Sequence, residues 1–445
     1  MTHDTITQDR TGLDYVKQGE AIAAIIPGLP AGTPRRPIAQ AAVIGAGTMG
    51  AGIATALLNA GLPVTMIEQT PEALQRGAAN IRKNLDSSVS RGRITQEEAD
   101  RRFGLLRPSL ELADIAGADL VIEAVFEDLG VKREVFAKLD RIASPNAFLA
   151  SNTSTLDVNA IAAAVRDPSR VLGLHFFSPA HVMRLLEIVR ADATAPDVLA
   201  SALDFAGRIA KVGVVAGVCD GFIGNRIFEE YLRQAYFLLD EGCVPRQIDD
   251  AMQAYGWAMG PFRVMDLAGG DIGWNIRKRR AIEQPDRPYS KIPDLICEMG
   301  RFGQKTNAGY YLYTPEARQG LRDPEIEAMI VAHSPSLGLR RREIGPAEIV
   351  ERCHLAMVNE AAKLLEEGIA YRPVDIDVIY VNGYGFPAAK GGPMFQADGA
   401  GIPALLERLH YYRQGYQGWT FEPAKLLLDL AARGADLASL NGHPG

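Results

Sequence analysis

One segment of the chain places a histidine and a glutamate where they can act together in proton transfer. His175 lies in an apolar run that ends at Ser178-Pro179, and Glu187 lies in the apolar run that follows. If the two runs return alongside each other as strands, the carboxylate meets the imidazole, fixes its tautomer and raises its basicity. A general base of this kind removes a hydroxyl proton while a hydride leaves the carbinol carbon. The pattern therefore predicts alcohol oxidation.

The spacing of these residues leaves two other interpretations open, one for His175 and one for a second histidine, His181. An isolated histidine on an apolar strand is often structural, with its ring nitrogens bonded to backbone groups, and His175 fits that description. His181 is a competing candidate for the base, but it falls in the expected turn, where we expect solvent around it.

A glycine-rich turn forms the second constellation. The stretch GAGTMG, residues 45–50, follows a short apolar run and opens a helical pattern, which is the context that dinucleotide binding requires. Gly45 permits a tight turn, Gly47 lets the backbone approach a pyrophosphate, and Gly50 lets helix and strand pack closely. The alternative is a turn whose glycines serve only unusual backbone angles. Given its context, we interpret the stretch as a dinucleotide site with the helix N-terminus facing the phosphates.

A carboxylate selects the form of the dinucleotide. Glu68 ends the next apolar strand, about 20 residues after the glycines, where a carboxylate holds the ribose 2′-hydroxyl and repels a 2′-phosphate. The sequence therefore predicts NAD rather than NADP, bound by Gly45, Gly47, Met49, Gly50 and Glu68.

Alternating strands and helices position both constellations. We expect apolar strands at 41–45, 63–67, 120–125, 148–151, 171–177 and 185–189. Helices are expected at 49–60, from 71 and at 132–142, and Thr95 with Glu98 fits a capping box for another helix. This alternation predicts an α/β Rossmann fold, a doubly wound and mostly parallel sheet covered on both faces.

The second half of the chain changes to helices and contains an internal repeat. The stretch FLLDEGCVPRQID, ending at Asp249, is similar to KLLEEGIAYRPVD, ending at Asp375. Further on, GPF up to Asp266 is similar to GPM up to Asp398. Solenoid repeats are only about 20–50 residues long, so this longer repeat indicates a duplicated all-α domain.

These observations predict four segments in the 445 residues. An N-terminal arm at 1–37 holds a helical piece at about 15–26 and a proline- and glycine-rich stretch that stops regular structure. The NAD-binding Rossmann domain is predicted at 38–217, the first helical domain at 218–335 and the second at 342–440.

Composition and charge exclude several classes of protein. Apolar residues at 47% and charged residues at 23% are ordinary for globular domains, and a net charge of −7 lacks the basic footprint of a nucleic-acid binder. Four separated cysteines without a C-x-x-C pair argue against a metal site or disulfides and for a reducing compartment. With no signal peptide and no bilayer-length apolar stretch, we expect a cytoplasmic protein without membrane insertion.

Several motifs, taken in order, resemble the 3-hydroxyacyl-CoA dehydrogenase family. They are GAGTMG, SNTSTL, HFFSPAHVMRLLEIV, DGFIGNRI and GRFGQKTNAGYYLY. The resemblance is strongest to the dehydrogenase half of multifunctional β-oxidation enzymes of peroxisomal and related bacterial type, and it extends over nearly the whole chain from about residue 15. It implies a Rossmann domain followed by two related helical domains, NAD as cofactor and an acyl-CoA thioester as substrate.

The resemblance also implies catalytic roles for individual residues. His175 resembles the catalytic base, and Glu187 its partner. Ser154 resembles the residue that hydrogen-bonds the substrate 3-oxygen near the nicotinamide, and Asn225 resembles the polar group that helps hold the substrate carbonyl. Serine and asparagine are also preferred helix caps, which is the structural alternative for Ser154 and Asn225.

The resemblance also implies that charged residues take part in ligand binding. Glu127 and Lys132 match positions that contact the nicotinamide ribose of NAD, with a solvated charge pair as the alternative. The basic run Arg277-Lys278-Arg279-Arg280 is typical of a solvated face, and contact of part of it with CoA phosphates is the alternative hypothesis.

Two departures from the family pattern bear on function. Many monofunctional relatives have Asn where this chain has Ser178, so one cofactor or substrate contact differs in kind, although the peroxisomal-type members share the serine. No part of the sequence corresponds to the hydratase region of the multifunctional enzymes, so we expect no hydratase activity from this chain.

The sequence therefore predicts an enzyme of fatty-acid and lipid metabolism that oxidises (S)-3-hydroxyacyl-CoA to 3-ketoacyl-CoA with NAD. The alternatives are a 3-hydroxy(dicarboxyl)acyl-CoA dehydrogenase of another catabolic or reductive pathway, and a non-catalytic, crystallin-like NAD-binding protein. Association with separate hydratase and thiolase proteins is a further possibility. A monomer or a homodimer is expected, since the second helical copy can cover the surface through which short relatives dimerise.

Overall fold

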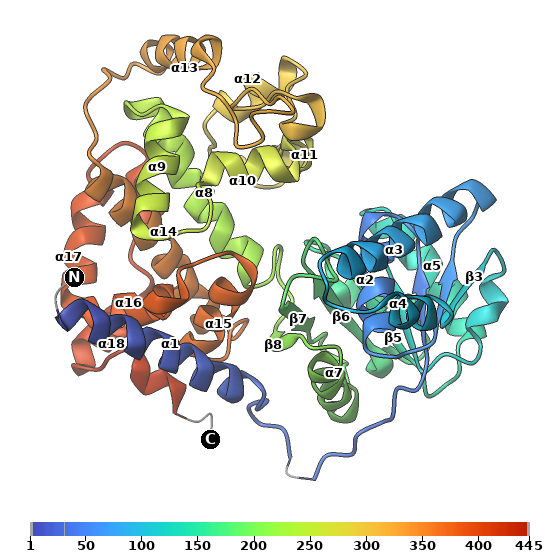
Figure 1. The fold of residues 1–445 in the computed structure, drawn as a ribbon. Coiled ribbons are helices and arrows are strands. Elements are labelled where there is room, and N and C mark those ends of the chain that lie inside the picture. Colours follow the sequence, from blue (N-terminus) through green and yellow to red (C-terminus); the bar gives the residue numbers. More distant parts are fainter. Residues whose placement is uncertain (1–2, 31, 443–445) are drawn as a thin grey trace. The chain divides into compact units, whose positions relative to one another are not determined.

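An eight-stranded sheet organises the first half of the chain in this computed structural model, which describes residues 3–30 and 32–442 (Figure 1). The strand order is β3-β2-β1-β4-β5-β6-β7-β8; β6 and β7 are antiparallel, and the other neighbouring pairs are parallel. This order reverses direction beside β1, as in dinucleotide-binding sheets, so the predicted Rossmann fold is confirmed. The strands are β1 (Ala41–Ile44), β2 (Val64–Ile67), β3 (Leu106–Ser109), β4 (Leu120–Glu123), β5 (Phe148–Ser151), β6 (Val171–Phe176), β7 (Leu185–Val189) and β8 (Val212–Ala216).

Two strands were absent from the sequence-based prediction. β3 contains Arg107 and Pro108 and lies half exposed at the sheet edge, where proline is tolerated and the apolar signal is missing. β8 is a five-residue apolar run with a glycine at its second position, and so short a run lacks a distinguishing period.

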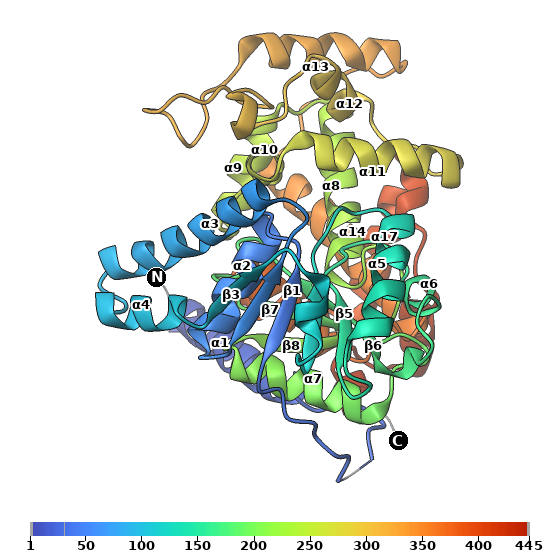
Figure 2. The same ribbon diagram turned by 90° about the vertical axis from the view of Figure 1, so that its right-hand side faces the viewer.

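Helices cover both faces of the sheet (Figure 2). Because side chains alternate along a strand, Val43 of β1 belongs to the core that contains Leu57 and Phe205 on one face, whereas Ile44 belongs to the core that contains Phe136 on the other. The covering helices are α2 (Thr48–Asn59), α3 (Pro71–Ser90) and α7 (Pro196–Arg208) on the first face, and α5 (Leu129–Ile142) and α6 (Val158–Ala162) on the second.

The predicted capping box forms only in part. The Thr95 hydroxyl accepts the Glu98 amide proton at 3.1 Å and begins α4 (Gln96–Phe103). The Glu98 carboxylate does not return to the Thr95 amide, because it binds the guanidinium groups of Arg101 and Arg102. Two arginines in the same short helix compete with the cap for this carboxylate.

The rest of the chain is helical, as predicted. The repeat appears as two helix series, in which Gly260-Pro261 and Gly392-Pro393 each begin a short helix. None of the described helices is long and apolar enough to cross a bilayer. The helices are α8 (Gly224–Glu241), α9 (Pro245–Tyr255), α10 (Pro261–Ala268), α11 (Gly270–Glu283), α12 (Ile292–Glu298), α13 (Pro324–Ser336), α14 (Pro346–Glu366), α15 (Pro373–Gly383), α16 (Pro393–Ala400), α17 (Ile402–Arg413) and α18 (Lys425–Arg433).

The chain forms two units whose composition does not follow the sequence order. One unit holds Asp14–Asn225 with Glu367–Tyr384, and the other holds Arg226–Glu366 and Gly385–Ser439 with the start of the N-terminal helix. Thus α15, from the second helical copy, lies in the same unit as the sheet. The predicted boundaries at 37, 217 and 335–342 stay predictions.

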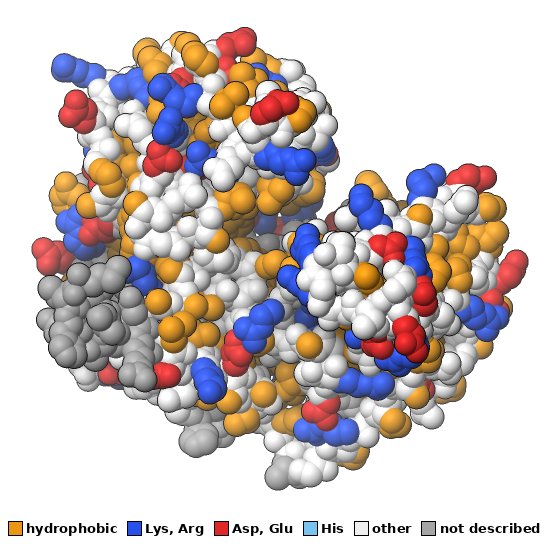
Figure 3. Space-filling model, in the orientation of Figure 1, with side chains coloured by type: hydrophobic (Ala, Val, Ile, Leu, Met, Phe, Trp, Pro, Cys, Tyr) orange, Lys and Arg blue, Asp and Glu red, His pale blue; other side chains and the backbone are white. Residues whose placement is uncertain are grey.

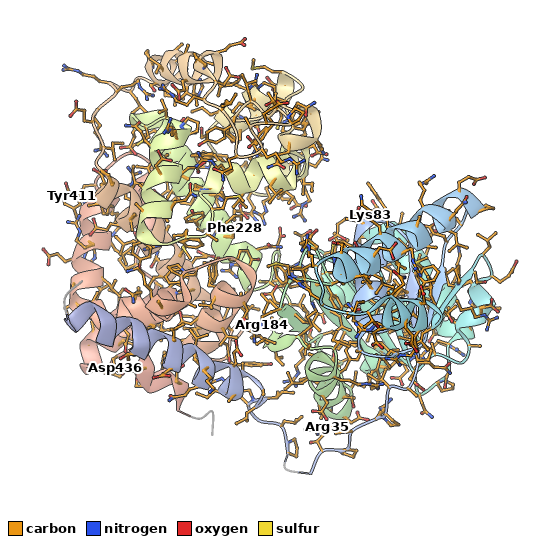
Figure 4. The ribbon with its side chains drawn as sticks, viewed as in Figure 1. Arg35, Lys83, Arg184, Phe228, Tyr411 and Asp436 are labelled. Carbon is orange, nitrogen blue, oxygen red and sulfur yellow. The ribbon has the colours of Figure 1, made fainter. Side chains whose placement is uncertain are left out.

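Polar contacts join α15 and the N-terminal helix to the sheet unit. That helix, α1 (His3–Ala23), is longer than the predicted 15–26 and begins earlier. Its Tyr15 hydroxyl donates to Asp377 of α15 at 2.8 Å, and Arg184, labelled in Figure 4, binds Glu20 at 3.1 Å. The Gly217 amide after β8 donates to the Ile369 carbonyl at 2.8 Å.

Replacing Phe136 by alanine tests the core beneath the predicted cofactor-binding half of the sheet. The Phe136 side chain is fully buried under β4 and β5, so we expect Phe136→Ala to lower the free energy of unfolding by about 3–5 kcal/mol. Lys138→Ala, on the exposed side of the same helix, should change it by less than about 0.5 kcal/mol. Equal denaturant midpoints for the two variants would contradict this packing.

Candidate active site

The glycine turn after β1 has the shape that a pyrophosphate requires. Gly45 has φ +100°, and a Cβ there would lie 2.6 Å from the Ala124 carbonyl oxygen. A Cβ on Gly50 would lie 1.9 Å from the Gly45 carbonyl oxygen, so helix α2 and the turn pack in direct contact. No atom lies within 4 Å of a Cβ built on Gly47. The turn is therefore closed on its protein side and open at Gly47, and it fits NAD.

Glu68 closes the same turn from β2. Its Oε1 atom accepts the Ala46 amide proton at 3.0 Å, and its Oε2 atom accepts that of Gln69 at 2.8 Å. The carboxylate thus lies at the carboxyl edge of the sheet beside the glycines, where a ribose hydroxyl is expected. Met49, also predicted to bind the cofactor, is partly buried and packs against the core under α2.

A buried ion pair lies at the carboxyl end of β4, the strand next to β1. Lys132 and Glu123 are almost fully buried, and the ammonium donates to Glu123 Oε1 at 2.7 Å. Ser151 donates to the other oxygen of Glu123 at 2.6 Å, so both carboxylate oxygens are satisfied. The same ammonium lies 3.2 Å from Glu127, which is 38% exposed. Lys132 is therefore a bridge between a structural and an accessible carboxylate, and the solvated pair considered for Glu127 and Lys132 is not what the structure contains.

Glu127 connects the ends of β4 and β5. Its Oε1 atom accepts the Thr153 hydroxyl proton at 2.6 Å and the Ser154 amide proton at 2.9 Å. Burial opposes its ionisation, but the Lys132 ammonium and these two donors hold the pKa of Glu127 below its usual value. The Ser154 hydroxyl is 3.5 Å from the same oxygen, at the limit of hydrogen bonding, and so remains available to a ligand.

His175 and Glu187 face each other across β6 and β7. They are direct register partners, and His175 Nδ1 lies 2.7 Å from Glu187 Oε2. Glu187 is fully buried, and its other oxygen accepts the Gly224 amide proton at 2.9 Å. Because the carboxylate accepts at Nδ1, that nitrogen carries the proton and Nε2 is left as the acceptor. The pair is thus arranged as a base with a fixed tautomer.

An unusual turn places aromatic and amide groups around this pair. Gly221 and Phe222 have φ of +82° and +50°, the left-handed region, where a phenylalanine costs about 1–3 kcal/mol. The turn brings the Phe222 ring to 5.8 Å from the His175 ring and directs the Gly224 amide to Glu187. The strain therefore serves the position of the dyad.

Asn225 follows in the first turn of α8. Its Oδ1 atom accepts a hydrogen bond from the Tyr384 hydroxyl at 2.7 Å. All the residues predicted to be catalytic, His175, Glu187, Ser154 and Asn225, lie in the sheet unit. No contact between Ser154 and His175 is seen, and their catalytic roles stay predictions.

The turn between β6 and β7 holds the competing candidate. His181 lies there, half buried, whereas the Glu187 carboxylate is bonded to His175 and Gly224, and burial and the Lys211 ammonium lower the pKa of His181. Lys211 itself donates to the carbonyls of Ala180 and Met183 and so fixes the turn. Ser178, the departure from the family pattern, is exposed in this turn.

The basic run of α11 is only partly a solvated face. Arg277 is buried and donates to Asp294 at 2.7 Å, and Arg280 is buried against Glu229. Lys278 lies over the Trp274 ring, 3.2 Å from its centre. Lys278 is exposed, and Arg279 is half-buried with its guanidinium 3.8 Å from Glu283, so the hypothesis of CoA contact concerns these two side chains. Elsewhere, acidic and basic side chains are interspersed on the face shown in Figure 3.

Sequence reasoning missed several residues of the site. Glu123 ends an apolar strand just as Glu68 does, so the same pattern would have found it. Tyr384 had no comparable signal, since it lies 159 positions from its partner in the sequence. The residues missed are Glu123, Ser151, Thr153, Phe222, Gly224, Tyr380 and Tyr384.

Comparisons with known proteins agree with this geometry. A family model described as 3-hydroxyacyl-CoA dehydrogenase, NAD binding domain, matches residues 40–219, and the model of the C-terminal domain of that family matches 221–313 and 349–436. The peroxisomal bifunctional enzyme of Cavia porcellus is 44% identical over 414 residues, which cover 90% of this chain and 57% of that protein. The chain thus spans little more than half the length of this relative.

Two solved structures share the fold over most of the chain. A 3-hydroxybutyryl-CoA dehydrogenase from Escherichia coli is 27% identical with a TM-score of 0.77, covering 89% of this chain and 99% of that one. The dehydrogenase part of multifunctional enzyme 1 from C. elegans is 27% identical with a TM-score of 0.68, covering 94% and 96%.

Alanine at two glycines separates cofactor binding from folding. Gly47 has φ −65°, which alanine adopts freely, and an added methyl meets only the space for the ligand. We therefore expect Gly47→Ala to keep the wild-type unfolding midpoint and weaken NAD binding by about tenfold or more, measured by calorimetry. Gly50→Ala should lower the unfolding midpoint, because its methyl overlaps the Gly45 carbonyl. Unchanged NAD affinity in Gly47→Ala would be inconsistent with this cofactor site.

Proposed function

This chain belongs to the 3-hydroxyacyl-CoA dehydrogenase family, and we propose that it oxidises (S)-3-hydroxyacyl-CoA thioesters to 3-ketoacyl-CoA with NAD in fatty-acid β-oxidation. The observation that carries the proposal is the 2.7 Å contact between His175 and the buried Glu187. Strands β1, β4, β5 and β6 are parallel, so the glycine turn, Glu127, Ser154 and His175 all occur at one carboxyl edge of the sheet. Ligands of doubly wound sheets bind at that edge.

The chain's own groups divide the chemistry of the reaction. His175 Nε2 accepts the proton of the 3-hydroxyl group, and Glu187 stabilises the imidazolium that forms. Ser154 holds the 3-oxygen, and Asn225 holds the thioester carbonyl. Bound NAD supplies the acceptor for the hydride of C3. The Phe222 ring and the Phe177 ring, whose centre lies 4.3 Å from that of His175, keep water away from the imidazole.

This arrangement favours catalysis over the crystallin-like alternative, because both oxygens of the Glu187 carboxylate are committed to the base and to the loop beside it. A dicarboxylated substrate, or the same reaction in the reductive direction, uses the same groups. Kinetic measurements therefore decide the acyl specificity. Rates with acetoacetyl-CoA and with longer and carboxylated 3-ketoacyl-CoA thioesters would rank these substrates.

We further propose that the matched residues supply the dehydrogenase step without hydratase activity, since the two family models that cover the chain are both dehydrogenase domains. Association with separate hydratase and thiolase proteins is part of the same proposal. The relative from Cavia porcellus is named as peroxisomal, and a cytoplasmic location for this chain remains a prediction that cell fractionation would test.

The proposed reaction is tested by NADH consumption with acetoacetyl-CoA. We expect a decrease in absorbance at the NADH band that depends on both the protein and the thioester. With crotonyl-CoA, we expect no hydration by the same preparation. A folded protein that binds NAD but does not oxidise NADH with any 3-ketoacyl-CoA would exclude the proposed function.

Removing either member of the dyad should affect turnover rather than cofactor binding. We expect His175→Gln and Glu187→Gln to reduce kcat by about 10²–10⁴-fold, because a positioned general base contributes about that factor. NAD affinity should remain close to that of the wild type. His181→Gln is the matched control, a histidine in the adjoining turn that does not contact Glu187, and it should retain kcat within about twofold. Wild-type turnover in either dyad variant would remove the assignment of the base.

A further inference from the structure

The second helical copy contributes a tyrosine to the site. Tyr384 follows α15 directly, and its hydroxyl donates to Asn225 Oδ1 at 2.7 Å. Burial and the Glu187 carboxylate raise the pKa of Tyr384 well above its usual value, so the hydroxyl keeps its proton and acts as a donor. Both residues belong to the sheet unit, so this contact is internal to it.

An asparagine side chain has two unlike ends, and its orientation decides what it can bind. Oδ1 only accepts hydrogen bonds, whereas Nδ2 donates two. Because Tyr384 occupies Oδ1, the end of Asn225 left for a ligand is the amide nitrogen. A thioester carbonyl accepts hydrogen bonds and does not donate them, so this is the orientation that a substrate carbonyl requires.

The backbone around Asn225 is shaped to admit the tyrosine. A Cβ built on Gly224 would lie 2.5 Å from both the hydroxyl oxygen and Cε2 of Tyr384. Only a residue without a side chain therefore allows the ring to reach Asn225. The same glycine donates its amide proton to Glu187, so one residue joins the tyrosine to the dyad.

Aromatic neighbours keep the Tyr384 ring in this place. Tyr380 stacks on it with ring centres 4.8 Å apart and donates its own hydroxyl proton to the Gly224 carbonyl at 3.0 Å. The Phe177 ring meets the Tyr384 ring edge-on, with ring centres 5.5 Å apart, and Phe177 in turn lies against His175. The ring is thus held on one side by α15 and on the other by the residues beside the base.

We propose that Tyr384 is a positioning residue, which orients the Asn225 amide so that its nitrogen donates to the acyl-CoA carbonyl. The inference rests on the proposed function, because it concerns how the substrate of that reaction is held. It also gives the duplicated helical domain a part in the site, since α15 and Tyr384 come from the second copy.

The test measures steady-state kinetics with acetoacetyl-CoA and NADH. Tyr384→Phe removes one oxygen and keeps the stacked ring, so we expect kcat/KM to fall about tenfold while NAD affinity and the unfolding midpoint are retained. Tyr15→Phe is the matched control, because it removes a tyrosine hydroxyl of the same unit that donates to Asp377 of α15 and does not contact Asn225. The control should keep wild-type kcat/KM.

A double-mutant cycle separates positioning from a general structural effect. In an Asn225→Ala background, Tyr384→Phe should change kcat/KM by less than about twofold, because the group it orients is gone. A tenfold loss in both backgrounds, or wild-type kcat/KM in Tyr384→Phe, would overturn the proposal. So would an altered pH profile of kcat, which would make Tyr384 itself an acid or base.

Gly224→Ala provides a second variant that keeps the tyrosine intact. Its methyl group overlaps both the ring and the hydroxyl of Tyr384 and moves the hydroxyl away from Asn225. We therefore expect kcat/KM to fall, and to fall less when Tyr384→Phe has already removed that hydroxyl. Equal losses in the two backgrounds would speak against the inference. If the wild-type protein does not oxidise NADH with any 3-ketoacyl-CoA, the proposed function fails. If it does and Tyr384→Phe is equally active, only the inference fails.

Discussion

The rest of the site depends on one antiparallel strand pair in an otherwise parallel arrangement. Because β7 runs back along β6, His175 and Glu187 are opposite each other in register, which brings a carboxylate and an imidazole to 2.7 Å within the apolar interior. A buried carboxylate is costly unless its oxygens are bonded. Glu187 satisfies this with the imidazole on one oxygen and the Gly224 amide on the other. The turn at Gly221 and Phe222, with φ in the left-handed region, directs the Gly224 amide to that second oxygen.

A similar rule governs the cofactor side of the edge. Glu123 and Lys132 are buried together, and each needs the other, because removing one partner from a buried pair leaves an uncompensated charge. Ser151 and the Val125 amide complete the bonds of Glu123, and the Lys132 ammonium bonded to it also holds Glu127 near the surface. The accessible carboxylate is therefore positioned by one that never meets solvent.

The duplicated helical domain takes part in this arrangement and is not a mere appendage. The segment Glu367–Tyr384, which contains α15, belongs to the sheet unit and is bonded there through the Ile369 carbonyl, the Asp377 carboxylate and the Tyr380 and Tyr384 hydroxyls. The duplication, seen in the sequence as two similar stretches of thirteen residues, thus places a tyrosine of the second copy against Asn225 of α8. Tyr384 lies beside Asn225 only because the chain returns to the sheet after α14.

The sequence by itself determined the fold class, the glycine turn, the acid at the end of β2 and the helical repeat, because each leaves a local signal of period, spacing or residue type. It also indicated His175 and Glu187 as a pair, on the condition that their strands return side by side. Only the tertiary structure decided that condition, and it alone brought Glu123 to Lys132 and Tyr384 to Asn225. It also showed that Arg277 and Arg280, which the sequence predicted to lie on a solvated face, are buried. Contacts between residues far apart in sequence depend on packing, which no local pattern records.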